Sequence, residues 1–139
     1  MIKMDKQKLI EELKRDEGVR FKPYHCSADK LTIGVGRNLD DVGISEAESD
    51  FLLANDIDNC VSELKRTFNW YEGLSNVRQR VMINMCFNLG LSRLMNFKNF
   101  LGAVESKDYT KAGVEMLDSK WARQVGPRAT RLKDMMVEG

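Results

Sequence analysis

Residues 15–39 are RDEGVRFKPYHCSADKLTIGVGRNL, and the spacing of the apolar side chains changes within this stretch. Up to Glu17 the pattern is helical, and Gly18 is the kind of residue that commonly follows the end of a helix. From Phe21 to Val35 the pattern changes to short strands around the polar segment SADK, residues 27–30. The stretch therefore predicts a helix with Glu17 at its carboxyl end, followed directly by a small β-hairpin.

Helical patterns flank this stretch on both sides. Upstream, Asp5 is a candidate N-cap. Downstream, Ser45 and Glu48 form a capping-box pattern, which predicts a long helix reaching at least Leu64. The segment NVRQRVMINMCFNLG, residues 76–90, is apolar on nearly every side and predicts a buried central helix. Further helices are predicted over residues 94–106, 109–124 and 127–139.

The order of these elements and the composition indicate one soluble α+β domain. A helix, a small sheet and then a bundle of helices is typical of the α+β class, and 139 residues suit a single domain. Lys and Arg number 22 against 21 Asp and Glu, a net charge of +1. This balance gives no reason to expect nucleic acid or stable membrane association. Residues 1–18 contain no apolar run suited to a signal peptide or a membrane span, so we expect the chain to begin in a cytoplasm.

The residue types that bind metals or form disulfides are few and widely spaced: Cys26, Cys60, Cys86 and the one histidine, His25. Neither a zinc site nor a disulfide framework fits this spacing, so we expect no metal and no cofactor. Neighbouring side chains on a strand point to opposite faces, which disfavours a catalytic dyad of His25 and Cys26. Gly34 and Gly36 lack the third glycine and the helix of a phosphate-binding loop.

A carboxylic acid at a helix end, followed by a hairpin that carries a second polar group and a threonine, matches the needs of glycoside hydrolysis. Residues 15–39 closely resemble the active-site segment of the phage-type lysozymes, glycoside hydrolase family 24, whose motif is E-G-x-R-x-x-x-Y followed by x-T-I-G-x-G. Residues 83–90, INMCFNLG, and 120–131, KWARQVGPRATR, also resemble that family in the same order. The resemblance implies a single lysozyme-like domain over residues 1–139, with two lobes and a cleft between them.

The resemblance assigns three catalytic positions. Glu17 occupies the position of the family's proton donor, Thr32 that of its threonine, and Cys26 stands where an aspartate is usual. Three roles are open for Cys26. With Thr32 it can polarise the attacking water, which gives inversion; its thiolate can attack the sugar, which gives retention; or Asp29 can supply the missing carboxylate and leave Cys26 a bystander.

The resemblance also implies a substrate-binding set in the cleft, formed by Phe87, Asn88 and Arg128. Asn88 and Arg128 are polar enough to hold saccharide hydroxyls or a carboxylate of the wall peptide. The resemblance further implies an ion pair between Arg37, after the TIGVG turn, and Asp56 on the following helix.

The implied activity is that of a muramidase, which hydrolyses β-1,4 bonds between N-acetylmuramic acid and N-acetylglucosamine in bacterial peptidoglycan. We expect a monomeric endolysin made in the host bacterial cytoplasm, acting at the periplasmic wall after a separate pore-forming protein releases it, and lysing the host. The alternative is a catalytically weakened module that binds peptidoglycan, because Cys26 replaces the usual acid. Retention of Glu17 and Thr32 argues for the enzyme.

Overall fold

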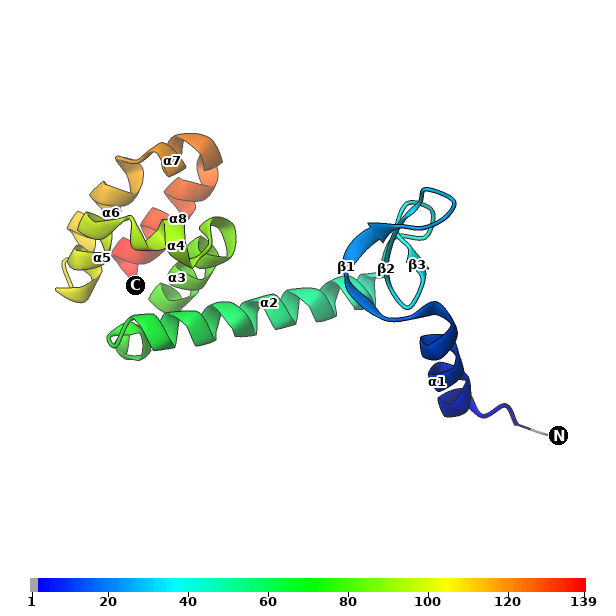
Figure 1. Ribbon diagram of the computed structural model, residues 1–139. Helices are drawn as coiled ribbons and strands as arrows, with labels where there is room; N and C mark the ends of the chain where they lie inside the picture. The colour runs from blue at the N-terminus through cyan, green and yellow to red at the C-terminus, as the bar shows by residue number, and fades with distance from the viewer. Residues whose placement is uncertain (1–2) are drawn as a thin grey trace. The chain divides into compact units, whose positions relative to one another are not determined.

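A computed structural model describes residues 3–139 (Figure 1). The chain forms two compact units, Met1–Phe51 and Leu52–Gly139, whose boundary falls inside a long helix. Within the described residues, no helix is both long and apolar enough to cross a membrane.

The first helix, α1, spans Lys6–Glu17. The Asp5 side chain accepts a hydrogen bond from the backbone N–H of Lys8 at 3.1 Å, which caps the amino end of the helix. At the other end Gly18 has a φ of 76°, and its N–H donates to the carbonyl of Lys14. The predicted cap and the predicted helix end at Glu17 are both confirmed.

A three-stranded antiparallel sheet follows in the order β1-β2-β3, with strands at Arg20–His25, Leu31–Gly34 and Arg37–Asn38. Tyr24 of β1 pairs with Thr32 of β2. The predicted hairpin is confirmed, but β3 was not predicted because two residues are too few to show a period. Val35, expected in a strand, lies in the turn between β2 and β3.

The long helix α2 spans Glu46–Thr67. Its capping box is reciprocal: the Ser45 N–H donates to Glu48 Oε1 at 2.8 Å, and the Glu48 N–H donates to Ser45 Oγ at 3.1 Å. Each side chain thus satisfies a backbone donor that the first helical turn leaves unpaired. The prediction from the spacing of Ser45 and Glu48 is confirmed.

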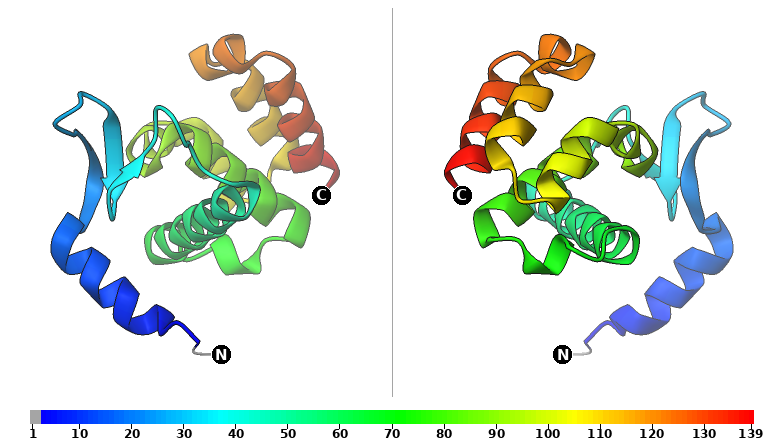
Figure 2. Two further views of the ribbon diagram at one scale, coloured as in Figure 1. Left: turned by 90° about the vertical axis from the view of Figure 1, so that its right-hand side faces the viewer. Right: turned by 90° about the vertical axis from the view of Figure 1, so that its left-hand side faces the viewer.

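The second unit is built from helices (Figures 1 and 2). It contains the apolar core of the described residues. After α2 its elements are η1 Tyr71–Gly73, α3 Asn76–Leu89, α4 Leu91–Met95, α5 Lys98–Glu105, α6 Tyr109–Leu117, α7 Lys120–Val125 and α8 Pro127–Glu138. Helix α3 is less enclosed than predicted. It buries one stripe, formed by Val81, Met82, Met85 and Cys86, whereas Phe87 and Asn88 are exposed.

Two predicted helices are each split. The segment predicted as one helix over 94–106 contains the end of α4 and all of α5, with Asn96 and Phe97 between them. The segment over 109–124 contains α6 and most of α7. Ser119 has extended backbone, and its Oγ accepts the N–H of Ala122 at 3.1 Å, so it begins a new helix. The helical spacing of apolar residues continues across both breaks, so the sequence pattern predicts one helix where the structure has two.

Candidate active site

Glu17 is the last residue of α1, and its side chain reaches the turn between β2 and β3. A methyl group built on Gly36, in that turn, would lie 2.9 Å from Glu17 Oε2 and 3.3 Å from its Cδ. The carboxyl group therefore lies directly against the backbone of Gly36. A carboxylic acid at the end of a helix and beside a sheet turn is suitably placed to give a proton to a substrate bound on this side of the sheet.

Cys26 begins the turn between β1 and β2. Its N–H donates to the carbonyl of Lys30 at 2.9 Å, and its own carbonyl accepts the N–H of Asp29 at 2.8 Å. The pKa of the half-buried Cys26 thiol is lowered, mainly by the backbone N–H of Lys30, then by that of Ala28, with a smaller contribution from the Thr32 hydroxyl. The turn therefore favours the thiolate, which is the basic and nucleophilic form of cysteine.

Thr32 lies on β2 and is 3% exposed. Its hydroxyl donates to the carbonyl of Lys30 at 2.8 Å. A hydroxyl has one proton and rotates to suit its partners, so donation to an ionised Cys26 requires that Lys30 give up this bond. Cys26 and Thr32 are thus brought together around the same turn, although they are six positions apart in the sequence.

Asp29, the other residue considered from the sequence for the second acid, also lies in this turn. Its φ of 59° is left-handed, a conformation that aspartate tolerates better than most residues. Its side chain is 93% exposed, and its Oδ1 lies 3.4 Å from Nδ1 of His25. Asp29 therefore points toward His25 and solvent, while only its backbone N–H bonds to Cys26.

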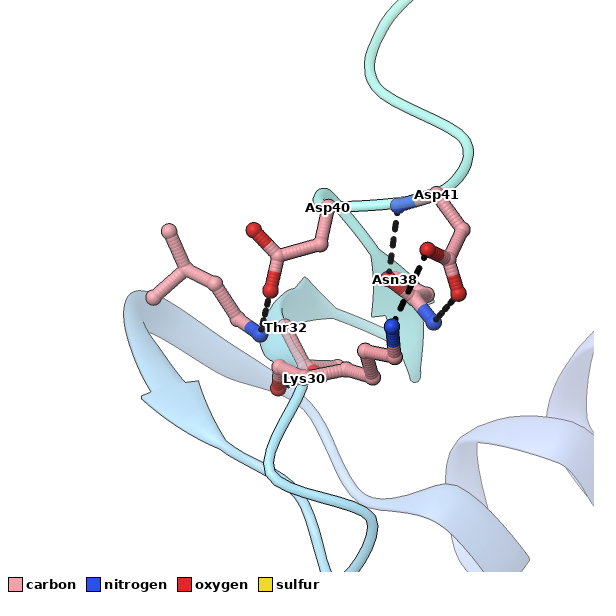
Figure 3. Close-up of polar contacts among 6 residues, drawn as sticks. Lys30, Thr32, Asn38, Asp40 and Asp41 are labelled. Carbon is pink, nitrogen blue, oxygen red and sulfur yellow. Dashed lines mark hydrogen bonds and ion pairs between the residues drawn. The ribbon is translucent and has the colours of Figure 1, made fainter.

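A network of acidic side chains braces the start of β2 (Figure 3). Asp40 Oδ2 accepts the backbone N–H of Leu31 at 2.7 Å, and Asp41 Oδ1 lies 3.3 Å from the Lys30 ammonium. Asn38 and Asp41 bond reciprocally, at 2.9 Å between the side chains and 3.0 Å from the Asp41 N–H. The network holds Lys30 and Leu31, the two residues directly before Thr32. Our sequence reasoning missed it, although Asn and Asp just after a strand often bond to nearby backbone.

Arg37 pairs with a different acid from the one predicted. Its two terminal nitrogens donate to Glu48 at 2.9 and 2.6 Å, and one also donates to the carbonyl of Gly43 at 3.0 Å. The expected partner Asp56 was wrong: Glu48 stands earlier on the same helix, and its carboxylate already faces Ser45 at the cap. Arg37, followed by Ser45, holds the pKa of Glu48 down, from 4.5 to about 2.

The second unit contains a pocket of about 440 Å³ with an apolar wall and a polar rim. The apolar wall is formed by Leu53, Ile57, Ile83 and Phe87, and the polar rim by Arg80, Asn84 and Arg128. Nε and one terminal nitrogen of Arg128 both donate to Asn84 Oδ1, at 3.0 and 2.7 Å. Phe87 and Arg128 thus line one pocket, and Asn84 orients Arg128, a role that the sequence pattern did not reveal.

Asn88 is not among the residues that line this pocket. Its Oδ1 accepts the indole N–H of Trp121 at 2.8 Å, and Trp121 is buried at 3% exposure. The bond fixes the amide so that its NH₂ group faces away from Trp121. Asn88 can therefore offer a hydrogen-bond donor, while Trp121 serves the core. In the described residues, no cluster of three or more His, Cys, Asp or Glu side chains could hold a metal ion.

Comparisons with known proteins cover most of the chain. The sequence model of the family described as phage lysozyme matches residues 14–134. Probable T4-type lysozyme 1 of Dictyostelium discoideum is 26% identical, with 91% of this chain and 92% of that protein covered. An endolysin of Acyrthosiphon pisum secondary endosymbiont phage 1 is 27% identical, with 80% and 75% covered. The pre-baseplate central spike protein Gp5 of Enterobacteria phage T4 is 24% identical, over 94% of this chain and 28% of that protein. Since the family match spans most of the sequence, the chain belongs to the phage lysozyme family and is a lysozyme-type glycosidase with peptidoglycan as its substrate.

Proposed function

We propose that this chain hydrolyses the β-1,4 bond between N-acetylmuramic acid and N-acetylglucosamine in peptidoglycan, with Glu17 as the general acid and Cys26 with Thr32 as the groups that hold and activate water. The observation that carries the proposal is the β1–β2 turn, where two backbone amides and the Thr32 hydroxyl favour a Cys26 thiolate. Glu17 lies against the next turn of the same sheet.

The proposed reaction is a single displacement at the anomeric carbon. Glu17 gives its proton to the bridging oxygen as the glycosidic bond breaks. The Cys26 thiolate takes a proton from the attacking water, whose oxygen forms the new bond to carbon. The Cys26 thiol then releases that proton to solvent, and Glu17 takes up a proton from solvent, which restores both groups. Attack from the face opposite the leaving group inverts the sugar configuration.

A set of matched variants tests these assignments by solubilisation of purified walls under reducing conditions. We expect Glu17→Gln to lower the rate about a hundredfold or more, which is the usual contribution of a general acid. Cys26→Ser should lose most activity, Cys26→Asp should retain or gain it, and Asp29→Asn should remain close to wild type. Normal cutting by Cys26→Ser together with failure of Asp29→Asn would instead assign the base to Asp29.

The configuration of the first product separates water activation from direct attack by sulfur. NMR spectroscopy of a soluble glycan fragment should show the α-anomer forming first if water attacks the β-linked sugar directly. Initial formation of the β-anomer would indicate a thioglycosyl intermediate on Cys26, which mass spectrometry of the trapped enzyme should also detect.

The second candidate function is wall binding without efficient cutting, and it is favoured by Cys26 at the position where the resemblance implies an acid. A wild-type protein that pellets with walls but does not solubilise them, and that Cys26→Asp makes active, would support this candidate. In either case we propose that Phe87, Asn88 and Arg128 contact the glycan or its peptide. After its two bonds to Asn84, the Arg128 guanidinium still has N–H groups that can bind a carboxylate.

We also propose a role in lysis of a bacterial host, supported by the relative named as an endolysin. In that role the protein is a monomer made in the cytoplasm, and a separate pore-forming protein lets it reach the wall. Cells that express the chain with a pore-forming protein should lyse, whereas cells that express the Glu17→Gln variant with the same pore should keep intact walls.

A further inference from the structure

We propose that Gly36 is a positioning residue for Glu17, because its missing side chain leaves the space in which the carboxyl group lies. The inference deepens the proposed function and rests on Glu17 being the acid. The three atoms nearest to a Cβ built on Gly36 all belong to Glu17: Oε2 at 2.9 Å, Cδ at 3.3 Å and Cγ at 3.5 Å. Any L side chain at position 36 would therefore come too close to the carboxyl group unless that group moved.

The backbone of the turn is held by the sheet, because Ile33 of β2 pairs with Arg37 of β3 on either side of it. The Arg37 side chain is also anchored. Arg37, the next residue, is bonded by both oxygens of Glu48 and by the carbonyl of Gly43. By contrast, among residues 3–51, the described part of the first unit, no hydrogen bond or ion pair is found on the Glu17 carboxylate. A methyl group at position 36 would therefore displace Glu17, which is the end of a flexible side chain, more easily than it would move the turn.

Gly34 provides an internal control in the same segment. Its φ is +69° and that of Gly36 is +63°, so alanine at either position meets a similar left-handed backbone strain. A Cβ on Gly34, however, meets no atom within 4 Å. Comparing the two alanine variants thus separates the backbone effect, which both share, from the contact with Glu17, which only Gly36 makes.

The first experiment measures unfolding and the kinetics of wall cleavage for Gly36→Ala and Gly34→Ala. We expect the two variants to unfold at similar urea concentrations. Gly36→Ala should have a kcat at least about tenfold below that of Gly34→Ala, since misplacement of a catalytic group by about 1 Å can cost about a hundredfold. The KM values should agree within about twofold. Equal kcat values for the two variants would overturn the inference.

A double-mutant cycle tests whether the effect passes through Glu17. In the Glu17→Gln background, Gly36→Ala should lower the residual activity no more than Gly34→Ala does, because no acid remains to be displaced. A full additional loss in that background would contradict the inference.

A readout independent of activity separates this inference from the proposed function. The ¹³C resonance of the Glu17 carboxyl carbon should shift in Gly36→Ala and stay unchanged in Gly34→Ala. An unchanged resonance in Gly36→Ala overturns the positioning role. If the resonance shifts while Glu17→Gln still cuts walls at the wild-type rate, Gly36 positions Glu17 as inferred, and the assignment of Glu17 as the acid is what fails.

Discussion

At the scale of single residues, the surroundings of Cys26 change its thiol pKa in the opposite direction from those of Cys60 and Cys86. Backbone amides lower the pKa of Cys26, whereas burial raises the pKa of Cys60 and raises that of Cys86 to about 12. Cys86 also lies beside Cys60, which further disfavours its ionisation. The same residue type thus has a lowered thiol pKa in the first unit and adds apolar volume in the second.

This contrast predicts selective alkylation of the folded protein. At neutral pH iodoacetamide should modify Cys26 first, because the thiolate is the reacting form and Cys26 has the largest fraction of it. Thr32→Val removes the hydroxyl that helps to stabilise the thiolate, so the reaction at Cys26 should slow, whereas Thr32→Ser should react at close to the wild-type rate. Mass spectrometry of tryptic peptides measures all three sites in one sample. Preferential labelling of Cys60 or Cys86 in folded protein would contradict the prediction.

The proposed catalytic residues are local in the sequence. Glu17, Cys26 and Thr32 lie within one short stretch, so a resemblance could suggest their roles without any knowledge of packing, and those roles stay predictions. The residues that orient a functional group lie far from it in sequence, as Asn84 does from Arg128 and Trp121 from Asn88. Those pairs depend on how helices pack, which no local pattern records.

At the scale of elements, Glu48 connects the sheet to the start of α2. One of its oxygens accepts both the Ser45 N–H and an Arg37 N–H, so the capping box and the ion pair share a group. Sequence spacing predicted the capping box because that motif is local. The partner of Arg37 was mispredicted because two acids, Glu48 and Asp56, lie on α2. The path of the chain between β3 and α2 decides which of them Arg37 contacts, and the sequence pattern does not reveal that path.

Because Glu48 takes part in both contacts, we expect the folded protein to lose stability as the pH is lowered. Its pKa is about 2 in the folded protein and 4.5 without these partners, so the unfolded state binds the proton more readily. The stabilisation is fully present above about pH 4.5 and is lost as the pH falls towards 2. Urea unfolding followed across this window should show a weaker pH dependence for Glu48→Gln than for wild type. Asp56→Asn is the matched control on the same helix, and an equal flattening in that variant would contradict the assignment of Arg37 to Glu48.

At the scale of the whole molecule, the core of the second unit is built from segments distant in sequence. Arg78 of α3 donates to the carbonyls of Met136 and Val137 in the last turn of α8, at 2.8 and 3.2 Å. Its guanidinium also lies 3.4 Å from the ring centroid of Tyr109, at the start of α6. One side chain thus connects three helices and satisfies carbonyls that a helix end leaves unpaired.

This arrangement predicts a large stability loss on removal of Arg78. Arg78→Ala should lower the free energy of unfolding of the second unit by about 2 kcal/mol, since hydrogen bonds from charged groups contribute more than neutral ones. Arg78→Lys should restore only part of the loss, because an ammonium cannot bond two carbonyls and stack on Tyr109 with the geometry of a planar guanidinium.

Arg80→Ala is the control, since the guanidinium of Arg80 bonds Asn76 on the same helix. Urea unfolding followed by tryptophan fluorescence measures the change, because Trp70 and Trp121 both belong to this unit. Equal losses in Arg78→Ala and Arg80→Ala would show that the contacts of Arg78 with α6 and α8 add nothing beyond the general effect of removing an arginine from α3.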